Sequence, residues 1–185
     1  MRKRIAVLLL AVTMVFLSMG CGEQKKESAY AQALDVLNAV VESYSADELF
    51  AMYGGDQENA VMDAPGTFDI TKAEELKTVL GLPKSQLPVI DDAASMVHLM
   101  NANTFTGAAY RLKADTDLDA FAEAVRESVL ATQWMCGIPD TLLMIDVDGT
   151  YVITAYGEAG IMDTFKNKAL SALDGSEILL EESIA

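Results

Sequence analysis

The sequence predicts an α+β fold, in which N-terminal helices precede a ββαββα unit and an antiparallel sheet of about four strands is covered by helices on one face. The first observation is composition: of 185 residues, 51% are hydrophobic and 22% are charged, which is typical of a globular chain. The second is the succession of helical and strand-like apolar patterns. The third is an Asp-Gly pair between two β-rich runs, a strong hairpin signal. Parallel βαβ winding is the alternative.

The first twenty residues have the layout of a secretory signal peptide. Basic residues at positions 2–4 precede an apolar run over 5–17, and small residues come just before Cys21. The run is shorter than the roughly 20 apolar residues that a transmembrane helix needs. We therefore expect residues 1–20 to be removed on secretion.

Cys21 decides between an anchored and a released protein. Residues 17–21 resemble a bacterial lipobox, in which the cysteine receives a diacylglycerol, and a polar tether over 21–28 follows. Ser18 and Gly20 also fit ordinary signal-peptidase cleavage, which would release a soluble protein. We expect lipidation of Cys21, which holds the protein on the extracytoplasmic face of the cell membrane, because two or three acyl chains suffice for stable anchoring.

The mature chain is strongly acidic. Removing residues 1–20 takes away three basic residues and no acidic ones, so 10 Lys and Arg face 28 Asp and Glu, a formal charge of −18. This charge argues against nucleic acid as a partner, because affinity for nucleic acid comes chiefly from Lys and Arg that neutralise phosphates. It also disfavours broad contact with anionic lipid. We interpret the acidity as solubility outside the cell.

The first half of the domain is predicted to be helical. Apolar residues recur at spacings of three and four within residues 30–53. Ser45 and Glu48 stand at the capping-box spacing, which predicts a second short helix that a glycine pair ends. Residues 55–70 hold turn formers and acids and are predicted to be a loop. Another capping box opens a helix over 71–80.

The second half is predicted to contain the sheet. Strands are expected on both sides of a central helix, and a last helix closes a single domain over residues 29–174. An acidic C-terminal tail over 175–185 follows. The expected elements are strands over 94–101 and 104–113, a helix beginning within 115–119, strands over 142–147 and 151–156, and a helix over 161–173.

Residues 146–150 have a superficial likeness to a calcium-binding loop. An EF-hand loop needs oxygen ligands at several positions, glycine at position 6 and a carboxylate at position 12. Counted from Asp146, those two positions hold Tyr151 and Gly157. The hairpin-turn interpretation is therefore preferred, and we predict no metal and no cofactor.

Cys136 and His98 form the one candidate nucleophile and base. An imidazole can activate a thiol, so a cysteine-dependent enzyme is an alternative function. Against it, cysteine is among the most buried residue types, and no oxyanion donor or third orienting group can be read from the sequence. The pair is also too small for a zinc site. We predict no catalytic residue and no enzymatic activity.

The segment Trp134–Asp140 is the most distinctive of the chain. Its tryptophan, with Cys136 beside it, could contact a ligand or partner from a surface loop. In the alternative, Trp134 fills the core where a helix turns into a strand, while Gly137 and Pro139 shape the turn.

A group of motifs then resembles the DUF4358 lipoproteins of clostridia and their relatives, over roughly residues 32–170. The family is uncharacterised, so the resemblance implies a Gram-positive cell-surface address and no catalytic residues. The motifs are Asp91-Asp92, Tyr110-Arg111-Leu112-Lys113-Ala114, Trp134 and Asp148-Gly149-Thr150-Tyr151-Val152.

We therefore expect a lipid-anchored extracytoplasmic protein that acts without catalysis, as a binding or accessory module at the cell envelope. Its partner would be an unidentified protein or small molecule. The alternatives are the cysteine-dependent enzyme and a soluble secreted protein with a structural or interaction role.

Overall fold

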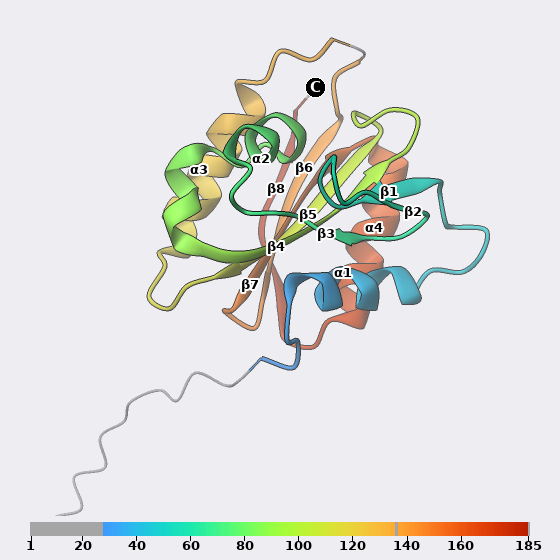
Figure 1. Ribbon diagram of the computed structural model, residues 1–185. Helices are drawn as coiled ribbons and strands as arrows, with labels where there is room; N and C mark the ends of the chain where they lie inside the picture. The colour runs from blue at the N-terminus through green and yellow to red at the C-terminus, as the bar shows by residue number, and fades with distance from the viewer. Residues whose placement is uncertain (1–27, 136, 185) are drawn as a thin grey trace, which may run out of the picture.

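The computed structural model describes residues 28–135 and 137–184 (Figure 1). They form an α+β domain with one antiparallel sheet. The elements follow in the order α1 (Ala33–Glu42), β1 (Met52–Gly54), β2 (Val61–Met62), β3 (Gly66–Thr67), α2 (Ala73–Leu80), the 3₁₀ helix η1 (Lys84–Val89), β4 (Ile90–His98), β5 (Phe105–Leu112), α3 (Leu118–Leu130), β6 (Thr141–Val147), β7 (Tyr151–Gly157), α4 (Ala159–Ala172) and β8 (Ser176–Ser183).

The sheet has eight strands where about four were predicted. Its order is β2-β1-β4-β5-β7-β6-β8, with β3 paired to β4 beside β1. All pairs are antiparallel, which overturns the parallel alternative. The predicted ββαββα layout is also incomplete, because three short strands precede β4 and one strand follows α4. The short strands were not predicted because two or three residues are too few to show the alternation of apolar and polar side chains that marks a strand.

Helices cover both faces of the sheet, not one (Figure 1). One core packs α1 and α4 on the sheet, and the other packs α2 and α3 on its opposite side. Strand β7 serves both cores because successive side chains point to opposite faces. Ile153 and Ala155 enter the first core, whereas Val152 and Tyr156 enter the second. The central strands β5 and β7 are therefore almost entirely buried.

The predicted acidic tail is wrong: residues 176–183 form strand β8 at the sheet edge, paired with β6. Two of its acids pair with cations from helices on the two faces, Glu181 with Lys166 and Glu182 with Arg126. A register shift in the pairing with β6 further obscures the alternation that marks a strand.

The predicted helix after Ser45 is also wrong, although its capping pair forms. Glu48 accepts hydrogen bonds from the backbone and hydroxyl of Ser45, but no helix follows. Lys168 of α4 lies 2.7 Å from the same carboxylate and holds this segment on α4. The chain then enters β1, where Met52 pairs with His98 of β4. Tertiary pairing overrides the local signal here.

The two ends of the sheet differ in the segments that lie there. We call the end with the β6–β7 turn the near end and the opposite end the far end. At the near end, β6 turns into β7 through Asp148 and Gly149, both at positive φ, as the hairpin signal predicts. The described chain also begins there. Ser28 donates a hydrogen bond to Asp148 (2.7 Å), and Tyr151 donates one to the Tyr30 carbonyl (2.9 Å).

The far end lies roughly 20–24 Å away, given about 3.4 Å for each residue of a strand such as β7. There β4 and β7 finish and β5 and β6 begin. The loops that connect β4 to β5 and α3 to β6 lie at this end, opposite the start of the described chain (Figure 1).

The signal peptide, Cys21 and Cys136 lie outside the described residues. Across 28–135 and 137–184, no helix combines the length and the apolar character that a membrane crossing requires.

Candidate functional site

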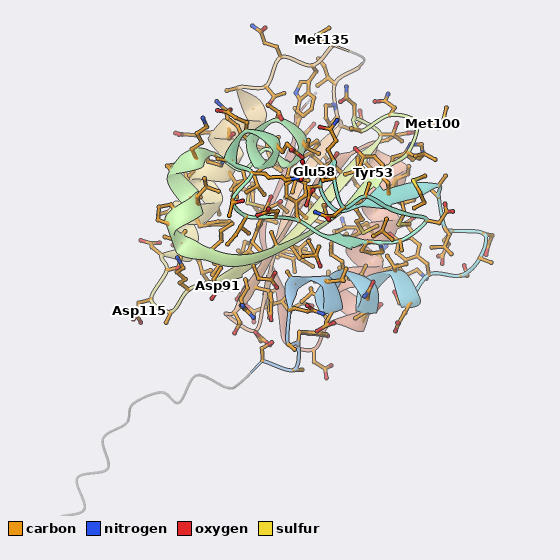
Figure 2. The ribbon with its side chains drawn as sticks, viewed as in Figure 1. Tyr53, Glu58, Asp91, Met100, Asp115 and Met135 are labelled. Atoms are coloured by element: carbon orange, nitrogen blue, oxygen red, sulfur yellow. The ribbon has the colours of Figure 1, made fainter. Side chains whose placement is uncertain are left out.

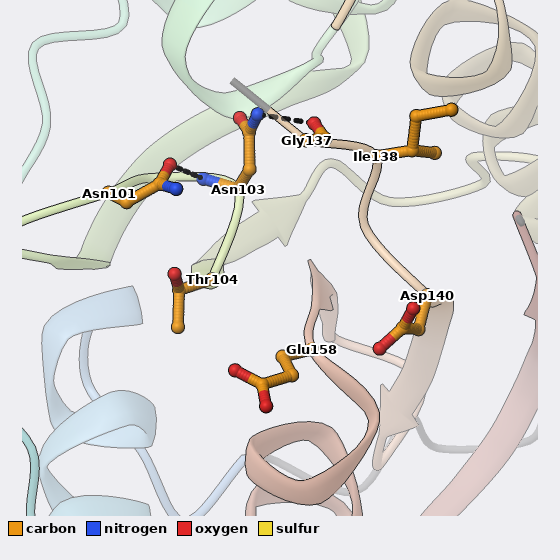
Figure 3. Close-up of a pocket in the computed structure, with 7 residues that line it drawn as sticks. All are labelled: Asn101, Asn103, Thr104, Gly137, Ile138, Asp140 and Glu158. Carbon is orange, nitrogen blue, oxygen red and sulfur yellow. Dashed lines mark hydrogen bonds between the residues drawn. The ribbon is translucent and has the colours of Figure 1, made fainter.

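A pocket of about 260 Å³ opens at the far end of the sheet (Figure 3). Three chain segments meet around it: the β4–β5 loop, the α3–β6 loop and the junction of β7 with α4. The lining residues are Asn101, Asn103, Thr104, Gly137, Ile138, Asp140 and Glu158.

Backbone hydrogen bonds fix these three segments to one another. The Asp140 N–H donates to the Gly157 carbonyl (2.9 Å), and the Glu158 N–H donates to the Thr104 carbonyl (2.9 Å). The Asn103 side-chain amide donates to the Gly137 carbonyl (2.6 Å) and joins the two loops. At Gly157 a Cβ would lie 2.3 Å from the Thr104 oxygen, so only glycine permits this close approach. These contacts hold the three segments together at the end of the sheet.

Two carboxylates line one side of the pocket, across from the two asparagine amides (Figure 3). One Asp140 oxygen accepts the N–H of Ala159 (2.9 Å), which caps the first turn of α4. Glu158 is exposed, and its carboxylate has no hydrogen bond or ion pair with any described residue. No Lys or Arg is among the lining residues, so the Glu158 carboxylate meets no side-chain cation in the pocket.

Exposed apolar side chains lie at the same end of the molecule as this acidic pocket. Met135 is 93% exposed and Met100 82%, and both lie at the same end of the molecule (Figure 2). Ile138, 59% exposed, lines the pocket itself, and Leu99 is exposed beside Met100. We call these four residues, with Asp140 and Glu158, the far-end surface.

Trp134 was interpreted from the sequence either as a partner contact or as a core residue, and its position has features of both. Its ring is partly exposed and packs on the core, with its centroid 5.3 Å from that of Tyr156. It stands next to Met135 of the far-end surface, so contact with a partner stays a prediction. Cys136, the other predicted contact, is not described.

His98 stabilises the start of the β4–β5 loop. Its ring stacks on Phe50, with centroids 5.5 Å apart. Its Nδ1 accepts the backbone N–H groups of Met100 (3.3 Å) and Asn101 (3.4 Å), which shapes the β4–β5 loop. The cysteine–histidine pair stays untested because Cys136 lies outside the described residues.

A second acidic group lies in the 55–69 loop, which carries β2 and β3, and the charge of its buried member is compensated. Asp56 is buried, and its carboxylate lies 2.6 Å from Lys72 Nζ. The same carboxylate accepts the backbone N–H groups of Glu58 and Asp69. Burial acts to raise the pKa of Asp56, but these hydrogen bonds and the ammonium outweigh it and hold the pKa below its ordinary value.

Glycines close the ends of that loop. A Cβ at Gly54 would lie 2.0 Å from the Gly66 nitrogen, so the backbones of β1 and β3 touch where both meet β4. Ser95 of β4 accepts the Gly55 N–H (3.0 Å). A hollow of about 440 Å³ lies beside the loop, but its acids Asp56 and Glu75 already face Lys72.

Sequence reasoning found one part of the far-end site and missed the rest. The Trp134–Asp140 segment does line the pocket, through Gly137, Ile138 and Asp140. Asn103 and Glu158 were missed, since nothing in the sequence shows that their loops meet. Comparisons of the chain with family models, with curated proteins and with solved structures found no match. The resemblance to the DUF4358 lipoproteins thus stays an expectation.

Proposed function

We propose that this protein is a lipid-anchored, extracytoplasmic binding module of the cell envelope that acts without catalysis. The N-terminal region supports the first part: a signal-peptide pattern ends at Cys21, and a polar tether leads into the domain. Lipid on Cys21 would hold the chain at the bilayer.

One observation carries the proposal: the described chain begins at the end of the sheet opposite the pocket. The chain enters the domain at Ser28, which is held on Asp148 at the near end. The pocket and the exposed Met100 and Met135 lie at the far end (Figure 2). A domain tethered at its near end presents its far end to partners away from the membrane.

The intact mass of the protein recovered from native membranes tests the anchor. We expect a chain that begins at Cys21 and carries a diacylglyceryl group, and we expect a Cys21→Ser variant to lose the modification and leave the membrane fraction. An unmodified mature chain would contradict anchoring and favour the soluble secreted alternative.

A further inference from the structure

The far-end surface combines exposure with apolar character. Its two methionines are among the most exposed large apolar side chains described, and the loops that carry them are joined by the Asn103–Gly137 hydrogen bond. Apolar side chains gathered on one exposed surface mark an interaction site. Methionine suits such a surface because its flexible thioether adapts to different partners.

The pocket within this surface fits one side chain better than a whole small molecule. Its volume of about 260 Å³ lies below the roughly 300–1,000 Å³ of typical small-molecule sites. Asp140 already meets the N-terminus of α4 through the Ala159 N–H, which leaves the Glu158 carboxylate without a cation among the described residues. The surface therefore offers a carboxylate that meets no side-chain cation. Its apolar rim consists of Ile138 in the pocket and of Met100 and Met135 on the two loops that line the pocket.

We infer that the far-end surface docks a segment of a partner protein in which a lysine or arginine lies between apolar residues. The cation enters the pocket between Asp140 and Glu158, and its apolar neighbours pack on Met100, Met135 and Ile138. This inference rests on the proposed function and names its partner class. Charge complementarity selects the cation, and the rim supplies apolar contact area.

Charge argues against two other occupants of the far-end surface, a second copy of this chain and an anionic membrane. A second copy would bring a net charge of −18 to an acidic surface, and an anionic membrane would be repelled likewise. Most cations in the described part of the chain are also engaged in ion pairs within the protein. These are Lys72, Lys84, Arg111, Arg126, Lys166 and Lys168.

The test is fluorescence anisotropy of a labelled pentapeptide with a central lysine between two leucines, titrated with the mature protein. The protein is held in phosphatidylcholine nanodiscs if it carries lipid and in buffer if it does not, with empty nanodiscs as reference. We expect saturable binding with Kd below about 1 mM, and at least roughly tenfold weaker binding of the twin peptide with norleucine in place of lysine. Glu158→Gln and Met135→Gln should each weaken binding about threefold or more.

Matched controls lie elsewhere on the surface. Glu42 and Leu170 are exposed away from the pocket, so Glu42→Gln and Leu170→Gln should leave the affinity unchanged. Equal binding of the lysine and norleucine peptides, or none at 1 mM protein (on the order of the weakest affinity expected), would overturn the inference. So would binding to lipid vesicles through Met135, or concentration-dependent dimers abolished by Met135→Gln. The peptide result does not depend on the lipid, so failure of the anchor and failure of the docking surface are distinguishable.

Discussion

The 55–69 loop and the far-end pocket both contain carboxylates, yet they use them in opposite ways. In the loop, Asp56 is 2% exposed and meets Lys72 and several N–H donors. In the pocket, Glu158 is exposed and its carboxylate has no hydrogen bond or ion pair with a described residue. A compensated, buried charge holds a fold together, whereas an uncompensated charge in a pocket is available to a ligand. The difference separates structural acids from candidate binding acids in one chain.

The largest expected effect on stability comes from the close approach of the β1 and β3 backbones at Gly54 and Gly66, which closes the 55–69 loop. Gly54→Ala places a Cβ 2.0 Å from the Gly66 nitrogen, and backbone cannot move aside as a side chain can. We expect a loss of at least about 3 kcal/mol in unfolding free energy, measured by denaturant titration. Gly160→Ala is the control of opposite sign: Gly160 has open space and lies in α4, so we expect a gain of about 0.5–1 kcal/mol. Equal effects of the two variants on the unfolding free energy would show that the Gly54 and Gly66 backbones do not approach each other closely.

The next effect comes from the compensated carboxylate. Asp56→Asn keeps the shape of the side chain but removes the charge that faces Lys72. We expect the unfolding free energy to fall by about 2–3 kcal/mol at pH 7, because a buried ion pair loses one member. An unchanged denaturation midpoint would place Asp56 with the exposed acids and remove the contrast between the two regions.

The stability that Asp56 supplies should depend on pH. Its pKa in the folded protein is lowered from 3.8, so the contribution is complete above that value and is lost as the pH falls through the lowered folded pKa. The gap between wild type and Asp56→Asn should therefore stay constant from pH 7 to about 5 and shrink below about 4, near the ordinary pKa of aspartate. Denaturant titrations of both proteins from pH 7 to 2 measure the gap. A gap that widens in acid has the wrong sign for this account.

The smallest expected effect on stability belongs to the pocket. Glu158→Gln makes the same carboxylate-to-amide change as Asp56→Asn, but the carboxylate makes no hydrogen bond or ion pair with a described residue. We expect the thermal midpoint to move by less than about 2 °C. A large loss on calorimetric scans would mean that Glu158 supports α4 and is not free for a partner.

The sequence carries the α+β class, the β6–β7 hairpin and much of the helix and strand succession because these depend on local patterns. The Asp148-Gly149 turn is a clear case, since both residues adopt the positive φ that the dipeptide favours. Strand β8 could not be recognised in the same way, because Glu181 and Glu182 suggest a solvated tail until Lys166 and Arg126 are known to lie beside them. Long-range ion pairs leave no local pattern.

The candidate site was predictable only in part for the same reason. The Trp134–Asp140 segment is distinctive in composition and does line the pocket. Glu158 is unremarkable in sequence, and its position opposite Asn103 depends on where β5 begins and β7 ends. Three glycines, at 54, 55 and 66, were the missed signal for the loop around Asp56, since closely approaching backbones need residues without side chains.

One paired measurement tests the central claim most directly: thermal midpoint and affinity for the lysine peptide, determined on Asp56→Asn and Glu158→Gln side by side at a temperature where both are folded. The account predicts a crossover. Asp56→Asn loses stability and keeps the wild-type affinity, whereas Glu158→Gln keeps stability and binds about threefold or more weakly. If both variants change the same property, or if Glu158→Gln leaves the affinity intact, the far-end pocket is not the binding site.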